Sequence, residues 1–258
     1  MLQLVRPLCL LAALLALALA ARAGRAEPPP NVAKPAQPAV AAEPSECDRR
    51  LSDLAIFTRQ PAIGGPGECG GEDLVKLEAV LMPDRSRVLL TPPATLLCAM
   101  AEGVAQFVRG ELAPAAAELG APLSSVVTAA SYDCRNRNRQ QAARISEHAR
   151  ANALDIGALK LADRTTVSLT DPMAPQAFRE QMRDAACRWF STVLGPGSDG
   201  YHDQHVHLDR AERDRGYRLC QWDVRAPPDP ASVPLPPPKP VEFTASPPNP
   251  EAPQPRRK

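Results

Sequence analysis

The spacing of apolar residues between about Cys47 and Asp223 switches repeatedly between the period of a helix and that of a strand. Long apolar faces predict a helix from Thr95 to about Leu112 and another from Asp171 or Pro172 through Leu194, ended by Gly195-Pro196. Shorter helices are predicted at 51–57 and 114–119, a glycine-rich loop at 64–71, and strands at 75–81, 87–90, 125–132, 153–156, 165–169, 205–209 and 217–222. This succession predicts an α+β domain.

Both flanks of the domain lack apolar periodicity. Residues 27–45 are rich in proline and alanine, and residues 224–258 are richer still in proline, with Pro-Leu-Pro-Pro-Pro-Lys-Pro at 234–240. Such segments bury too little apolar surface to fold, so we expect a linker and a disordered, extended tail. The 46–223 segment between them is long enough for one domain with a single core.

Residues 1–26 have the order of parts found in a secretory signal peptide. Arg6 supplies positive charge, an apolar run follows at 7–21, and small residues offer cleavage sites before residue 27. The run is short for a spanning helix, which needs about 20 residues, although an uncleaved anchor is the alternative. We therefore expect a periplasmic or secreted mature protein without a transmembrane span.

The charges of the chain are nearly balanced. Thirty lysines and arginines face 29 aspartates and glutamates, a formal net charge of +1. A nucleic-acid-binding protein usually carries a basic excess, so no nucleic-acid partner is predicted.

Six cysteines lie beyond the predicted signal: Cys47, Cys69, Cys98, Cys134, Cys187 and Cys220. An even number behind a secretory signal predicts three disulfides, and buried free thiols are the alternative. None shows the Cys-x-x-Cys spacing of a zinc or redox motif. The sequence does not fix the pairing; the pairing we expect is Cys47–Cys69, Cys98–Cys134 and Cys187–Cys220.

All four histidines fall in two short segments. His148 precedes Asp155 by seven residues, and the other three lie together at 202–207. Imidazole and carboxylate are zinc ligands, and three of them plus a water form a catalytic zinc site. On a continuous helix seven residues span roughly 10 Å, too far for one metal. We therefore expect the chain to bend, with His148 ahead of a strand at 153–156.

The second segment reads as a strand that presents its histidines on one side. His205 and His207 are two residues apart and would share a face, while Val206 and Leu208 face the core. Two neighbouring strands would then direct Asp155, His205 and His207 into one cleft. A surface His148 and a merely polar strand face are the alternatives.

These segments resemble the signature of a group of zinc peptidases. Ser146-x-His148-x-x-Ala151-x-Ala153-x-Asp155 is similar to the Ser-x-His-x-x-Gly-x-Ala-x-Asp motif of D-alanyl-D-alanine peptidases and murein endopeptidases, relatives of the hedgehog domain. His202-x-x-His205-x-His207 resembles the second motif of the group. Ser131-Tyr132-Asp133-Cys134-Arg135 resembles its Tyr-Arg segment with two residues inserted. With the cysteine positions, this segment makes residues 47–209 resemble most the bacterial extensin-like C-terminal domain family.

The resemblance implies a small antiparallel sheet packed with helices. It implies that His148, Asp155 and His207 hold Zn²⁺. His205 would be the general base or electrostatic partner of the water that zinc activates, and His202 would assist near the transition state. Arg135 would stabilise the oxyanion, although a solvated charge is the alternative reading. The implied partner is peptidoglycan or another cell-wall peptide.

Two departures from the motif leave the function open. Ala151 replaces a glycine, which is tolerable unless the position needs a positive φ. Gln204 stands where some relatives place a glutamate, and glutamine cannot act as a base. Intact His205 and Arg135 favour a zinc peptidase or amidase acting on peptide cross-links. Gln204 favours a non-catalytic module that binds zinc or the cell wall.

Overall fold

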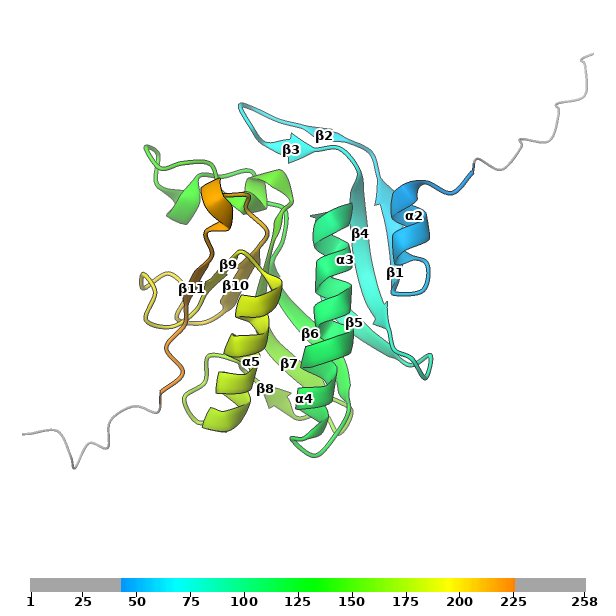
Figure 1. Ribbon diagram of the computed structural model, residues 1–258, viewed down its shortest axis with the longest axis vertical. Helices are drawn as coiled ribbons and strands as arrows, with labels where there is room; N and C mark the ends of the chain where they lie inside the picture. Colours follow the sequence, from blue (N-terminus) through cyan, green and yellow to red (C-terminus); the bar gives the residue numbers. More distant parts are fainter. Residues whose placement is uncertain (1–42, 226–258) are drawn as a thin grey trace, which may run out of the picture. The chain divides into compact units, whose positions relative to one another are not determined.

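A nine-stranded sheet with helices packed on it makes up most of the part of the chain that the structure describes (Figure 1). The structure is a computed structural model and describes residues 43–225. The strands of this sheet are β1 Ala55–Gln60, β4 Leu74–Leu81, β5 Arg87–Leu97, β6 Leu123–Ala130, β7 Ala153–Leu161, β8 Thr166–Val167, β9 Thr192–Leu194, β10 Val206–Asp209 and β11 Leu219–Gln221. The predicted mixture of helices and strands is confirmed.

The sheet is larger than the small antiparallel sheet that was expected. Its strand order is β1-β4-β5-β6-β7-β10-β9-β11, and β8 pairs with β7. Two neighbouring pairs, β5–β6 and β9–β11, are parallel, and the other pairs are antiparallel. A separate hairpin of β2 Ile63–Gly64 and β3 Gly70–Gly71 occupies the predicted glycine-rich loop.

The helices are few, and the longest two cover one face of the sheet (Figure 1). The helices are α2 Glu46–Leu51, α3 Cys98–Phe107, α4 Ala113–Ala117 and α5 Gln176–Trp189, with a π-helical turn at Val108–Leu112 between α3 and α4. Short 3-10 helices lie at Arg137–Arg139, Glu147–Arg150 and Asp214–Gly216. No helix within residues 43–225 is both long and apolar enough to cross a membrane.

Alternation along the two central strands separates core from site. Leu154 and Ile156 of β7, and Val206 and Leu208 of β10, belong to the hydrophobic core under the helices. The residues between them therefore point to the opposite face of the sheet. The expectation that Val206 and Leu208 face the core is confirmed.

Both long helices begin later than predicted, at Cys98 and at Gln176, and the second also ends earlier. Strand β5 continues to Leu97, because Leu96 and Leu97 pair with β4, and α3 begins only at Cys98. An apolar run fits a buried strand as well as a helix, so its spacing could not separate the two. Helix α5 ends at Trp189, and Thr192–Leu194 forms β9 between β10 and β11.

The first helix lies earlier than the predicted 51–57 helix. Ser45 and Asp48 form a capping box that starts α2 at Glu46. The chain then pairs with β4 as β1, so residues 55–57 are a strand.

Three disulfides are present, and two differ from the expected pairing. Cys187–Cys220 is confirmed, but the other bridges are Cys47–Cys98 and Cys69–Cys134. Contact between α2 and α3 brings the Cα atoms of Cys47 and Cys98 to 5.9 Å. Because β3 packs against the 147–150 turn, Cys69 reaches Cys134, with a Cα separation of 5.4 Å.

Three predicted segments lie outside the described residues: the signal peptide at 1–26, nearly all of the 27–45 linker and nearly all of the 224–258 tail.

Candidate metal centre

His148 lies in a 3-10 turn directly ahead of strand β7. Ser146 caps this turn by accepting a hydrogen bond from the His148 backbone N–H, and Ala151 ends it in the left-handed region, at φ 54°. The left-handed residue reverses the chain direction, so His148 folds back over β7. This is the bend that two ligands seven residues apart require.

Antiparallel pairing of β7 with β10 brings the two histidine segments together. Asp155 is the direct partner of His207 in this ladder, and both side chains leave the sheet on the face opposite the core. Residues directly opposite each other on neighbouring strands have adjacent side chains. The register therefore places Asp155 beside His207, with His148 above them.

Three side-chain atoms converge on one point. His148 Nε2 lies 3.1 Å from Asp155 Oδ1 and 3.1 Å from His207 Nδ1, and the last two atoms are 2.9 Å apart. All three residues are buried. Three ligands of a tetrahedral Zn²⁺ lie about 3.3 Å from one another when each bond is about 2.0 Å. The triangle is thus close to the size that one such ion would need.

The outer nitrogen of each ring is held by an oxygen that can only accept. His148 Nδ1–H donates to the Ser131 carbonyl at 2.6 Å, and His207 Nε2–H donates to Asp209 Oδ2 at 3.0 Å. With these protons fixed, the inner nitrogens of neutral rings carry lone pairs directed at the carboxylate. Such outer partners are a usual feature of zinc-binding histidines. The donor set therefore fits a metal ion.

The buried charges shift the protonation of these groups strongly. Burial by itself lowers the pKa of His207, but hydrogen bonds with Asp155 and Asp209 outweigh burial and raise that pKa to about 9. Burial tends to raise the pKa of Asp155, yet hydrogen bonds from His148 and His207 hold it far below its usual value. Without an ion, His207 therefore keeps a proton, which a metal would displace.

His205 stands beside the triangle and is more exposed. Its Nε2 atom is 3.4 Å from Asp155 Oδ2. Burial is the main cause that lowers the pKa of His205, and the Asp155 charge opposes it only in part. A neutral imidazole in this position can accept a proton.

His202 forms a dyad with a carboxylate that the sequence did not single out. His202 Nδ1 is 2.6 Å from Asp199 Oδ1, and its ring centroid is 5.1 Å from that of His205. Asp199 also accepts hydrogen bonds from the Tyr201 backbone and the Asn138 side chain. These contacts fix the His202 ring at the edge of the cleft.

Arg135 lies in the wall of the same cleft. The cleft has a volume of about 430 Å³ and is also lined by Arg137, Arg139 and Arg213. Arg135 Nε donates to Asp133 Oδ2 at 3.0 Å, which limits its freedom without burying it. The structure thus brings all six predicted residues, His148, Asp155, His202, His205, His207 and Arg135, around one cavity.

Sequence reasoning missed Asp209, Asp199 and Ser131. Asp209 could have been found, because it continues the alternation His205-x-His207-x-Asp209 on one strand face. Asp199 lies in an irregular loop, and Ser131 contributes a backbone carbonyl, so neither has a periodic signal. A second group of potential ligands among the described residues, Cys47, Asp73 and Cys98, is not a metal site because its sulfurs form a disulfide.

The family model described as "Extensin-like protein C-terminus" matches residues 45–221 of the chain. This range includes all three disulfides and the whole cleft. Searches of curated proteins and of solved structures found no match.

Proposed function

The chain belongs to the extensin-like protein C-terminus family, and from its histidine cleft we propose that it is a zinc-dependent peptidase or amidase that cleaves peptide cross-links of peptidoglycan. One observation carries the proposal: His148, Asp155 and His207 present three converging ligand atoms with both outer ring nitrogens hydrogen-bonded. A periplasmic or secreted location, expected from residues 1–26, would place the protein with this substrate.

The three ligands would hold Zn²⁺, which would activate a water and polarise the scissile carbonyl. His205 would take the proton of the attacking water, since its ring is next to Asp155 and its lowered pKa keeps it neutral. His202, oriented by Asp199, would donate a proton to the leaving amine. Arg135 would stabilise the negative charge that develops on the carbonyl oxygen.

The second candidate is a non-catalytic module that binds zinc or the cell wall with the same residues. Gln204 favours it, because a glutamate at this position serves as the base in some zinc peptidases that the chain resembles. His205 answers this objection in part, since it supplies a basic nitrogen next to the ligand triangle.

Elemental analysis and peptidoglycan digestion test the proposal together. Purified protein should carry about one zinc per chain, and His148→Ala should lose it. His205→Ala should keep its zinc and lose about 10²–10⁴-fold in rate, the usual contribution of a positioned acid–base group. The rate is read by mass spectrometry of peptidoglycan fragments bearing D-alanyl cross-links, with and without chelator.

Each outcome separates the candidates. Wild-type protein that holds zinc but releases nothing would support the binding module. Full zinc occupancy in a variant with His148, Asp155 and His207 all changed to alanine would refute the metal site. Zinc loss in His205→Ala would mean that His205, and not His207, is a ligand.

A further inference from the structure

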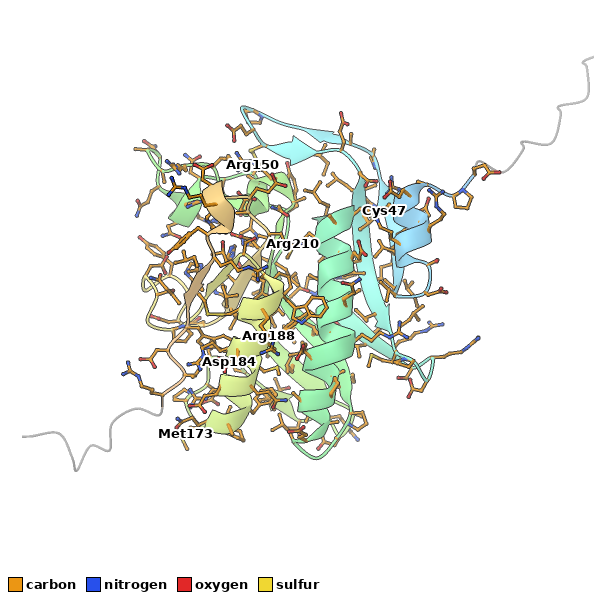
Figure 2. All side chains as sticks on the ribbon, viewed as in Figure 1. Cys47, Arg150, Met173, Asp184, Arg188 and Arg210 are labelled. Carbon is orange, nitrogen blue, oxygen red and sulfur yellow. A yellow bond between two sulfur atoms is a disulfide. The ribbon has the colours of Figure 1, made fainter. Side chains whose placement is uncertain are left out.

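A second hollow adjoins the histidine cleft. It has a volume of about 970 Å³ and shares Arg135, Arg137, Glu147 and Arg213 with the cleft. The two hollows therefore lie next to each other on the same side chains. Figure 2 labels Arg150, which is one of the residues that line this second hollow.

The second hollow carries an excess of positive charge. Five arginines and three glutamates line it, which leaves an excess of two positive charges. Arg150 pairs with both Glu147 and Glu68, so its single charge offsets only one of these two carboxylates, and the positive excess comes from the other four arginines. Among residues 43–225, no carboxylate pairs with Arg137, Arg144 or Arg213.

The guanidinium group of Arg213 donates to the Ser191 carbonyl and the Thr192 hydroxyl, whereas those of Arg137 and Arg144 come from one closed loop. The Arg137 N–H donates to the Arg144 carbonyl at 2.9 Å, and Asn136 and Ile145 form a bridge beside them. The Cys69–Cys134 disulfide anchors the start of this loop to the β2–β3 hairpin. The arginines therefore stand on a fixed support at the edge of the hollow.

We propose that this hollow, called here the arginine subsite, binds the free carboxylates of a peptide substrate. A guanidinium presents paired donors that match a carboxylate. The peptide part of this inference rests on the proposed function, because the scissile amide at the histidines would place neighbouring residues in the shared space. The subsite would thus select acidic peptides over neutral ones.

The test compares two labelled synthetic peptides that end in D-alanyl-D-alanine, one with two glutamates ahead of this end and one with two glutamines. Fluorescence anisotropy on the isolated full-length protein gives both affinities. Mass spectrometry of the same samples reports whether either peptide is cut. Arg144→Gln is the test variant, because Arg144 lines the subsite and not the cleft. Arg87→Gln, an exposed arginine outside both hollows, is the matched control.

The glutamate peptide should bind more tightly than the glutamine peptide. Arg144→Gln should weaken its binding by about 3- to 10-fold and leave the glutamine peptide unchanged, since only a charged hydrogen bond is lost. Arg87→Gln should match wild type for both peptides.

The arginine subsite would be overturned if wild type bound the two peptides with equal affinity. It would also be overturned if Arg144→Gln bound the glutamate peptide as tightly as wild type does. A labelled polyphosphate chain is measured in the same way. If it binds in an Arg144-dependent manner while the glutamate peptide does not bind, the subsite recognises a phosphate polymer and the proposal is overturned. These measurements distinguish a failure of the subsite from a failure of the proposed function. Cleavage of both peptides without charge selectivity would refute only the arginine subsite. Selective binding of the glutamate peptide without cleavage would refute only the proposed enzymatic activity.

Discussion

Asp209 shows how a residue outside the triangle of His148, Asp155 and His207 can position one of its side chains. Its carboxylate accepts a hydrogen bond from His207 Nε2–H at 3.0 Å and another from the Ala211 backbone N–H at 3.0 Å. The His207 ring is therefore fixed in both orientation and tautomer. The strand places Asp209 two residues after His207, so one backbone conformation positions ligand and support together.

We predict that Asp209→Asn lowers zinc affinity by about 10- to 100-fold, the usual effect of removing an outer partner. The asparagine can still accept the hydrogen bond, so the loss reports the missing negative charge. Competition with a chromogenic chelator measures the affinity. Asp53→Asn, at an exposed position away from the cleft, should equal wild type. Unchanged affinity in Asp209→Asn would contradict the support assigned to this carboxylate.

Ala151 occupies a backbone position that favours glycine. Its φ is 54° and ψ is 25°, and its side chain is fully buried. An alanine in this left-handed region costs roughly 1 kcal/mol relative to glycine. The departure from the glycine of the resembled motif therefore carries a conformational cost, which a buried methyl group offsets by about 0.8 kcal/mol.

Because these two contributions nearly cancel, the unfolding free energy of Ala151→Gly should lie within about 1 kcal/mol of that of wild type. Ala151→Val should lose at least about 2 kcal/mol, since a β-branched residue is strained at positive φ and adds volume to a filled site. Urea denaturation measures both. A valine variant as stable as wild type would show that the turn can relax without the left-handed residue.

At the scale of elements, the disulfides join segments that the sheet does not. Cys47–Cys98 fastens α2 to α3, Cys187–Cys220 fastens α5 to β11, and Cys69–Cys134 fastens the β2–β3 hairpin to the loop that carries Arg135. The last bridge thus links the wall of the cleft to a hairpin outside the main sheet.

Non-reducing digestion and mass spectrometry should recover these three pairs, with almost no free thiol at the six positions. Replacing Cys69 and Cys134 together by serine should cost about 2–5 kcal/mol of unfolding free energy, read by urea denaturation. Recovery of a Cys47–Cys69 peptide would instead favour the pairing expected from the sequence. Several free thiols would argue against an oxidising compartment.

At the scale of the whole molecule, the buried histidine centre couples folding to pH. The pKa of His207 is raised from 6.5 to about 9. Protonation of His207 contributes its full stabilisation of the folded state below pH 6.5. This contribution disappears as the pH rises through about 9. Its size is on the order of 3 kcal/mol for a shift of this extent.

Chelator-treated protein should therefore lose stability between pH 6.5 and about pH 9. Zinc-loaded protein should not show this loss, because the metal replaces the proton on His207. Thermal unfolding across this range measures both, and His207→Gln, which cannot titrate there, is the control. A metal-free wild type with constant stability over the window would contradict the raised pKa.

The sequence by itself determined which residue types face which side. Strand period placed His205 and His207 on one face and Val206 and Leu208 in the core, and the seven-residue spacing required a bend between His148 and Asp155. Both inferences depend only on local geometry, which is why they could be made without a fold. The even number of cysteines behind the expected signal peptide predicted three bridges, because this inference needs only the composition and the compartment and not the fold.

Only the tertiary structure decided which segments meet. Strand register set His207 opposite Asp155, and packing of α2 on α3 selected Cys98 as the partner of Cys47. Pairing with β10 and β11 made Thr192–Leu194 a strand, although the apolar spacing there continued that of a helix. These outcomes depend on contacts between residues far apart in the chain, and local spacing carries no information about such contacts. For the same reason only the fold shows that Arg137, Arg144 and Arg213 line one hollow.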